Sequence, residues 1–134
     1  AIIEGIAYAL RDGLEGIERR QHAKVKEIAV SGGGSQSDAI CQITADIFGV
    51  PVFRVQTYET ASLGCAIVGY KYLGVYNSYE EAVKNMVRRS KTFYPNMENH
   101  EKYDYLFKKV YLKMFGRLSD MYVDLKKFSK KYSD

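Results

Sequence analysis

A run of glycines between a strand and a helix is the feature that most constrains this chain. Residues 27–30 are β-prone and predict a strand, which ends at the glycines of residues 32–34. After them, Ile40, Ile43 and Ile47 recur at helical spacing and predict a helix. Glycines remove every side chain from the point where helix amide groups point outward, so a ligand can approach the backbone closely. By itself, the pattern fits both a structural tight turn and a binding loop.

The residues after this helix complete a unit of strand, loop, helix and strand. Gly49 is a helix stop, Pro51 prevents the helix from continuing, and residues 52–55 predict a second strand. A crossover of this kind joins parallel strands with right-handed chirality, and ligands tend to bind beyond the carboxyl ends of such strands. The loop matches neither the G-x-x-x-x-G-K-[ST] phosphate loop nor the G-x-G-x-x-G dinucleotide motif.

The opening segment predicts an amphipathic helix, because its apolar residues recur at steps of three and four. These residues are Ile3, Ile6, Ala7, Leu10, Leu14 and Ile17. The helical pattern begins without a capping residue and without a methionine. We therefore expect that residues upstream have been removed.

Downstream of the second strand, the pattern is mostly helical. A helix is predicted from about residue 59 to residue 73, with a face of small side chains that would let another element approach closely. That face consists of Ala61, Gly64, Cys65 and Val68. Ser78 and Glu81 have the spacing of a capping box and open a further helix. Residues 91–95 break the pattern, and two more helices, separated near Gly116, complete the chain.

Length and charge narrow the class of protein. The 134 residues suffice for one domain, and no apolar stretch approaches the roughly 20 residues of a spanning helix, so we expect no membrane contact. The net charge is +4, and the surplus of lysine and arginine gathers near the C-terminus. Apolar residues recur between these basic residues at helical steps, which indicates solvated helix faces and no nucleic-acid partner.

The cysteines and histidines form no recognisable site. Cys41 and Cys65 lie among apolar residues of predicted helices and outside any C-x-x-C pair, so we expect reduced core thiols. His22 and His100 stand alone near expected helix ends, so we interpret them as surface residues and predict no metal site.

Several segments agree, in order, with one known family. Residues 31–38 read Ser-Gly-Gly-Gly-Ser-Gln-Ser-Asp, and residues 59–66 resemble an E-x-x-A-x-G-A-A helix. The further matching segments are residues 6–12, 14–16, 42, 45–46, 49–52 and 93–95. Together they resemble the FGGY family of carbohydrate kinases, which includes glycerol, xylulose, ribulose, gluconate and fuculose kinases. The resemblance covers nearly the whole chain.

The resemblance implies an actin-like ATPase fold, in which two RNase H-like domains enclose a cleft. ATP lies mainly against the C-terminal domain of such enzymes, and the sugar mainly against the N-terminal domain. We therefore expect residues 1–134 to form a single partial α/β domain, the nucleotide-binding C-terminal portion of a two-domain sugar kinase whose catalytic N-terminal domain is absent. The expected fold is helix-rich and contains the short parallel β-α-β unit.

The resemblance also implies which residues contact the nucleotide. The backbone of Gly33 and Gly34 would lie close to adenosine, and Asp38 would face adenine or ribose. The family usually has Asn at the position of Asp38, and a carboxylate can accept a hydrogen bond from the adenine amino group but cannot donate one. The alternative for Asp38 is a helix cap or a partner of the helix dipole. For Asp46 and Glu59 we favour structural roles.

The implied reaction is the transfer of the γ-phosphate of ATP, with Mg²⁺, to a hydroxyl of a small sugar or polyol. The parent protein would be a cytoplasmic phosphotransferase with an alcohol group as acceptor. In the family, the catalytic aspartate, the sugar-binding residues and the phosphate-gripping loops lie upstream of the matched stretch. We therefore assign no catalytic and no metal-binding residue, and we expect this chain alone to bind ATP or ADP at most and to be inactive.

Two alternatives stay open at this point. One is a non-catalytic helical binding module, which would not need a strand that ends in three glycines. The other is an actin-like nucleotide sensor, whose upstream sequence would lack the catalytic aspartate.

For an actin-like protein we also expect exposed apolar surface near the first residues and around the strand at residue 52. A sheet edge that lacks its neighbour would then favour formation of a homo-oligomer.

Overall fold

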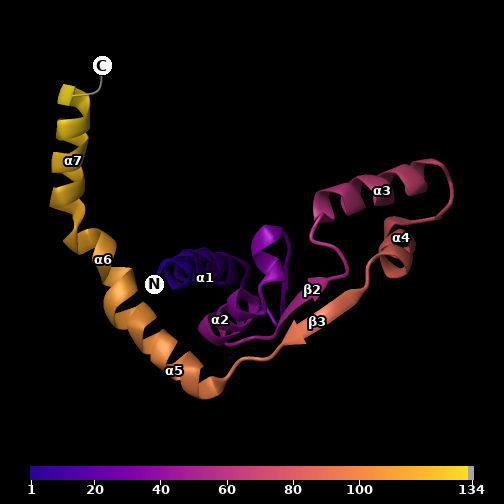
Figure 1. Cartoon of the computed structure of the whole chain (residues 1–134), viewed down its shortest axis with the longest axis horizontal. Helices are drawn as coiled ribbons and strands as arrows, with labels where there is room; N and C mark the ends of the chain where they lie inside the picture. The colour runs from indigo at the N-terminus through magenta and orange to yellow at the C-terminus, as the bar shows by residue number, and fades with distance from the viewer. Residues whose placement is uncertain (133–134) are drawn as a thin grey trace. The chain divides into compact units, whose positions relative to one another are not determined.

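The computed structural model describes residues 1–132, which form seven α-helices and one small sheet (Figure 1). The chain divides into two compact units, Ala1–His100 and Glu101–Asp134. The sheet and the glycine loop both lie in the first unit, which therefore contains everything that positions the candidate site. Among residues 1–132, no helix is long and apolar enough to cross a membrane.

The sheet has three strands in the order β1-β2-β3, namely β1 (Ile28–Val30), β2 (Val52–Val55) and β3 (Arg89–Phe93). Strands β1 and β2 are parallel, with Ile28 opposite Val52, which confirms the predicted parallel β-α-β unit. Strand β3 runs antiparallel to β2 and places Phe93 opposite Val52. The sheet is therefore mixed, and β2 is its central strand.

Strand β3 lies where the sequence predicted a break at residues 91–95. Its residues Arg89 and Lys91 are charged, which disfavours a strand in a reading of local pattern alone. In the structure, these charges pair with Glu27 and Asp38, which lie 62 and 53 positions earlier in the chain. The partners that make the strand favourable are thus distant in sequence.

Helix α2 (Asp38–Phe48) connects β1 to β2 and packs on one face of the sheet. Two of its residues, Cys41 and Ala45, are buried against Val52 and Phe93. Cys41 is therefore the core thiol that the sequence predicts. Cys65 is exposed, so the same prediction is wrong for the second cysteine.

Helix α2 ends where Gly49 packs against the ring of His100, and we call this contact the joint at Gly49. Gly49 has a left-handed backbone with φ of 70° and donates its N–H to Ala45 O at 2.8 Å. The ring of His100 lies directly beside it, with Nδ1 at 2.8 Å from Asp46 O. A Cβ atom on Gly49 would lie 2.5 Å from Cε1 of His100. His100 is half-buried in this joint, so its interpretation as a surface residue is wrong.

Asp46 is buried beside this joint and ties α2 to the start of α5 (Met97–Leu106). One carboxylate oxygen, Oδ1, accepts the backbone N–H of Asn96 at 2.8 Å. The other, Oδ2, accepts Nδ2 of Asn99 at 3.0 Å. Its role is structural, as expected, but its partners come from a segment about 50 positions later and not only from its own helix.

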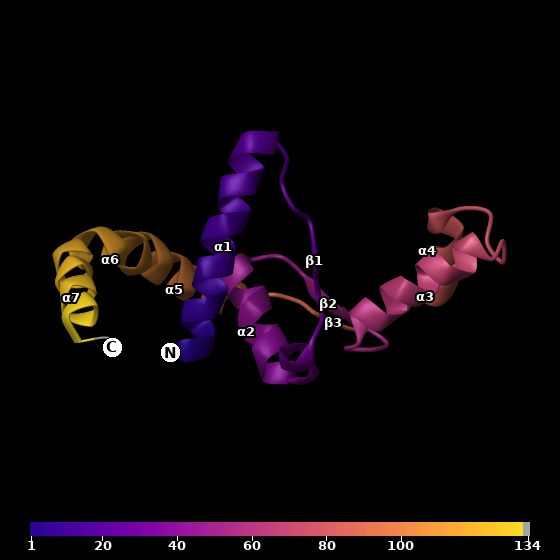
Figure 2. The same cartoon turned by 90° about the horizontal axis from the view of Figure 1, so that it is seen from above.

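Helix α1 (Ile2–Gln21) lies against α2 (Figure 2). Buried Arg11 joins them, because its Nη1 donates to Ile47 O at 3.0 Å and its Nε to Glu15 at 3.0 Å. Of the predicted apolar stripe, Ala7 is buried, but the other members are not. Four of them are exposed, namely Ile3, Ile6, Leu10 and Ile17. The sequence therefore predicts the helix correctly but not the face that packs within this chain.

Helices α3 (Thr60–Tyr72) and α4 (Tyr79–Met86) pack on each other after β2. The predicted capping box is confirmed in part, since Ser78 Oγ accepts the N–H of Glu81 at 3.1 Å. The carboxylate of Glu81 turns instead to the N–H of Asn77, at 2.8 Å. No residue of α3, which the structure describes in full, is buried. Its face of small side chains lies exposed.

The second unit continues from α5 through a π-helical turn, η2 (Phe107–Tyr111), into α6 (Leu112–Arg117) and α7 (Ser119–Tyr132). The helices separate at Leu118, close to the predicted break at Gly116. Two lysines of this unit pair with acids three or four positions earlier in the chain. These pairs are Lys108 with Asp104 at 2.7 Å and Lys127 with Asp124 at 2.9 Å.

The expected exposure around residue 52 is wrong, because β2 is the central strand and Val52 is fully buried. Strand β3 pairs with the edge of β2 for which the sequence analysis predicted no neighbouring strand. Among the described residues, the edges of the sheet are β1 and β3. The expected exposure near the first residues is confirmed by Ile2 and Ile6, which are 82% and 59% exposed.

The joint at Gly49 generates a stability prediction. Gly49→Ala combines a left-handed backbone with a clash against His100, so we expect a loss of unfolding free energy of about 2–5 kcal/mol. Gly74→Ala is the matched control, because Gly74 has φ of 71° and open space around a Cβ. It isolates the backbone effect, about 1–2 kcal/mol. Chemical denaturation of both variants checks this, and equal losses would show that the His100 contact contributes nothing.

Candidate functional site

The glycine loop folds into a single tight turn after β1. Gly32 has φ of 82°, and its carbonyl oxygen accepts the N–H of Ser35 at 3.1 Å and the Ser35 hydroxyl at 2.7 Å. Residues Gly33–Gln36 form the 3-10 turn η1, in which Ser35 is buried while Gly33 and Gly34 are exposed. The turn therefore presents the backbone of two glycines outward.

Glycine at positions 33 and 34 is not required by the chain itself. A Cβ atom added to either residue would meet nothing within 4 Å among the described residues. Neither residue has a positive φ, in contrast to Gly32. Packing and backbone strain within the described part therefore leave these two glycines unexplained.

Helix α2 begins directly after this turn, with Ser37 as its cap. Ser37 Oγ accepts the N–H of Ile40 at 3.4 Å. Asp38 is the first residue of the helix, so the alternative in which Asp38 caps it is wrong. Its charge still lies at the helix N-terminus, where the dipole favours an anion.

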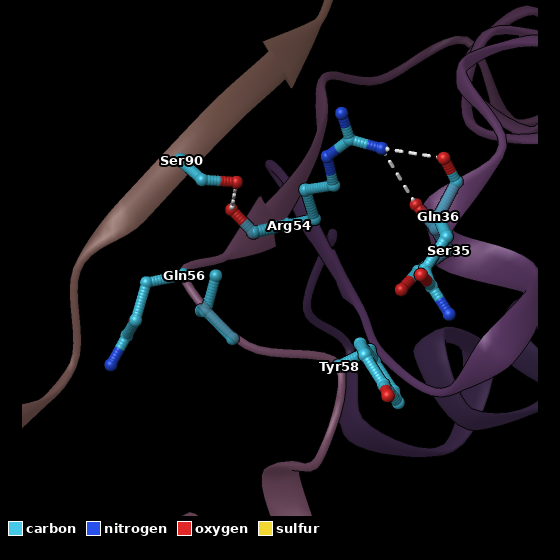
Figure 3. A pocket seen from close by; sticks show the side chains of 7 residues that line it. Ser35, Gln36, Arg54, Gln56, Tyr58 and Ser90 are labelled. Atoms are coloured by element: carbon cyan, nitrogen blue, oxygen red, sulfur yellow. Dashed lines mark hydrogen bonds between the residues drawn. The ribbon is translucent and has the colours of Figure 1, made fainter.

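Arg54 of β2 links the loop, the helix start and the sheet. Its Nη1 donates to the carbonyl oxygens of Ser35 at 3.0 Å and Gln36 at 3.1 Å, as Figure 3 shows. Its Nη2 lies 2.8 Å from Oδ1 of Asp38. One guanidinium group thus holds two peptide units of the loop and one carboxylate. The guanidinium group also lies near the ring of Phe93, whose centroid is 5.6 Å from Cζ of Arg54.

Lys91 of β3 supplies a second cation to Asp38. Its Nζ lies 2.5 Å from Oδ2 of Asp38. This hydrogen bond from Lys91 is the main reason why the pKa of Asp38 lies below its ordinary value, and the charge of Arg54 adds to the effect. The carboxylate is therefore ionised at neutral pH, and it is still 52% exposed.

Asp38, Arg54 and Lys91 form an ion cluster, and two hollows flank it. The first, of about 250 Å³, lies at the carboxyl end of β2 (Figure 3). It is lined by Ser35, Gln36, Arg54, Val55, Gln56, Tyr58 and Ser90. The second, of about 610 Å³, is lined by Asp38, Ala39, Gln42, Lys91, Thr92, Phe93 and Tyr94. Asp38 belongs to the second hollow, and the exposed Gly33 and Gly34 line neither.

The structure thus brings Asp38 to the loop and adds two residues that the sequence did not indicate. Arg54 and Val52 are two positions apart in β2 and therefore lie on the same face, the one that α2 covers. A charged residue on a face that is expected to pack against a helix was a usable signal in the sequence. Lys91 gave no signal, because β3 was not predicted. Beside them, burial raises the pKa of the Cys41 thiol, so this group stays neutral. Its Sγ lies 3.3 Å from Ser35 O.

The residues that the structure describes do not form a cage for Mg²⁺. Among the described residues, no group of three or more His, Cys, Asp or Glu side chains could hold a metal ion. Asp38 is the one carboxylate of the ion cluster, and two cations already contact it.

Comparison with known proteins places this geometry in context. Residues 1–72 match the family model described as the FGGY family of carbohydrate kinases, C-terminal domain. The chain is 34% identical to a xylulose kinase from Staphylococcus epidermidis over 93% of this chain and 25% of that kinase. It is 36% identical to a glycerol kinase from Aquifex aeolicus over 76% of this chain and 21% of that kinase.

Solved structures show the same relationship. A ligand-bound xylulose kinase from Lactobacillus acidophilus matches with a TM-score of 0.83 and 26% identity, over 93% of this chain and 25% of that one. A gluconate kinase from the same species matches with a TM-score of 0.82 and the same coverage. The fold is therefore the C-terminal part of an actin-like ATPase. The chain spans about a quarter of the length of these proteins.

The ion cluster predicts how Asp38 titrates. Lys91→Met removes the main cause of its low pKa, so we expect the pKa of Asp38 to rise. Because the folded pKa is lowered, the ion pairs stabilise the fold above the ordinary pKa of Asp, about 3.9, and this contribution is lost as the pH falls through the lowered pKa.

Carbon-13 NMR titration of the Asp38 carboxyl group checks this. Lys108→Met is the matched control, because Lys108 pairs with Asp104 and does not touch the cluster. An Asp38 pKa that is the same in both variants would contradict the assignment.

Proposed function

Because the chain belongs to the FGGY family of carbohydrate kinases, we propose that it is the ATP-binding C-terminal portion of a two-domain sugar kinase. The complete enzyme would transfer the γ-phosphate of ATP to a hydroxyl of a small sugar or polyol. The observation that carries the proposal is the outward backbone of Gly33 and Gly34, which nothing within the described chain explains. A nucleotide in contact with that backbone supplies a reason for both glycines.

We place the adenosine against the loop and the start of α2. The loop lies beyond the carboxyl end of β1, where open α/β sheets bind their ligands, and it leads into a helix N-terminus. A carboxylate has about four lone-pair positions, and Arg54 and Lys91 occupy two of those on Asp38. The exposed remainder of Asp38 would accept a hydrogen bond from the adenine amino group.

Phosphoryl transfer needs further groups that the described residues do not supply. It requires a metal ion at the phosphates, residues that hold the γ-phosphate and a group that orients the attacking hydroxyl. Since this chain spans about a quarter of its relatives, we propose that the rest of a longer polypeptide provides these groups and the sugar site. Mg²⁺ would enter with ATP, bound mainly through the phosphates.

The remaining partners follow from the charge and edges of the chain. Two lysines of the second unit, Lys108 and Lys127, pair with Asp104 and Asp124, which supports an ordinary solvated surface and no nucleic-acid partner. Strand β1 has a neighbour on one side only within the described sheet, which supports pairing with a further strand or with a second copy. We propose a cytoplasmic enzyme with ATP or ADP and a sugar or polyol as ligands.

Substitution of Asp38 tests the placement of the nucleotide. In the complete kinase, Asp38→Ala should weaken ATP binding by about 1.5–3 kcal/mol, the contribution of a hydrogen bond to a charged group. Asp38→Asn should retain much of the affinity, because the amide oxygen still accepts. Isothermal titration calorimetry with ATP measures both.

Glu27→Ala is the matched control for lost ion pairing. Glu27 pairs with Arg89 of β3 and does not touch the loop, so the variant loses an ion pair but should keep its ATP affinity. Unchanged ATP affinity in Asp38→Ala, together with a lowered melting temperature, would make Asp38 a structural residue.

The division of labour between the parts gives a second test. The chain of residues 1–134 alone should produce no ADP in response to sugar, because the described residues offer nucleotide contacts only. The assay uses MgATP with a panel of ketoses, aldoses, polyols and glycerol, and the complete kinase is the positive control. Sugar-dependent ADP production by the chain alone, above a blank without sugar, would refute the division.

A further inference from the structure

Arg54 is the side chain through which the sheet holds the glycine loop. We propose that Arg54 is a positioning residue, which fixes the loop in the conformation that binds nucleotide and does so without contact with the nucleotide. The inference rests on the proposed function, since it concerns the same loop. It is carried by the contacts of Arg54 with Ser35, Gln36 and Asp38.

The contacts of Arg54 set the direction of the peptide groups in the loop. Both carbonyl oxygens that accept from Nη1, those of Ser35 and Gln36, point toward β2 (Figure 3). In a trans peptide, the C=O and the N–H point in opposite directions, and the described chain contains no cis peptide bond. Fixing Ser35 O toward the sheet therefore turns the N–H of Gln36 away from it. The outer, glycine-bearing side of the turn is the side on which we place the nucleotide.

The guanidinium group is held on several sides before any ligand binds. Its strand is the central one, its face lies near the Phe93 ring, and its Nη2 pairs with Asp38. The side chain is only 23% exposed. A side chain held in this way loses little conformational freedom when a ligand binds, so it can hold the loop in its binding conformation beforehand.

Lysine cannot reproduce these contacts. The planar guanidinium group directs several N–H donors at fixed angles, whereas an ammonium group is a single charged point on a flexible stem. Arg54→Lys would keep the charge near Asp38 but could not hold both carbonyl oxygens and the carboxylate in the same geometry. This substitution therefore separates the geometry of the contact from its charge.

Arg89 is a matched control on the same sheet. It also projects from a strand, pairs with a carboxylate through two N–H groups, and lies over an aromatic ring. Its partners are Glu27, at 2.7 and 2.5 Å, and Phe53, whose ring centroid lies 3.9 Å from Cζ. None of these contacts involves the glycine loop, so Arg89→Lys removes the same kind of interaction elsewhere.

Steady-state kinetics of the complete kinase that carries this chain tests the proposal. Arg54→Lys should raise the KM for MgATP about tenfold, because about 1.4 kcal/mol of loop ordering would then have to come from nucleotide binding. The KM for the sugar should stay within about twofold, because the loop binds the nucleotide and not the sugar. Arg89→Lys should leave both KM values unchanged. Melting temperatures of the two variants show whether the fold is weakened to the same extent.

The outcomes separate this inference from the proposed function. A lower melting temperature with an unchanged KM for MgATP in Arg54→Lys would overturn the positioning role. If the unaltered kinase shows no sugar-dependent use of ATP, the proposed function fails. Hydrogen exchange then still tests the contact itself. The amides of residues 33–38 should exchange faster in Arg54→Lys than in Arg89→Lys, and equal exchange in the two variants would overturn the inference.

Discussion

The packing of α2 on one face of the sheet is the constraint on which the rest of this structure depends. Cys41 and Ala45 are buried against Val52 and Phe93, and this contact fixes where α2 begins relative to β2. The glycine loop must then lie beyond the carboxyl end of β1, within reach of a side chain from the central strand. Arg54 makes that contact, and the position of the candidate site is thus a consequence of ordinary core packing.

Polar contacts lock the two ends of α2. At its start, Arg54 and Lys91 converge on Asp38, while Ser37 caps the helix. At its end, buried Asp46 accepts hydrogen bonds from the segment that leads into α5, and His100 packs on Gly49. A buried carboxylate is tolerated there because its hydrogen bonds replace those to water. The helix that carries the candidate nucleotide contact is therefore held by groups from three separate segments.

The sequence pattern correctly predicted those elements of the fold that depend on residues close together in the chain. The glycine loop, α2 and the parallel pairing of β1 with β2 all follow from residues close in sequence. Strand β3 was missed because Lys91 is favourable only beside Asp38, which lies 53 positions away. The buried face of α1 and the exposure of Cys65 were misjudged for a related reason, since periodicity identifies a helix but not the element that covers it. Of the candidate site, Gly33, Gly34 and Asp38 remain predictions, and the contacts of Arg54 and Lys91 with Asp38 became visible only in the three-dimensional arrangement.

The central claim is that a nucleotide contacts the outer backbone of the glycine loop. Hydrogen exchange of the complete kinase, with and without MgADP, tests it most directly, because it reports on backbone amides one segment at a time. The account predicts that the amides of residues 33–38 gain protection when MgADP is added, while the amides around Gly74, outside the loop, do not change. Protection that appears elsewhere in the enzyme and leaves residues 33–38 unaffected would contradict it.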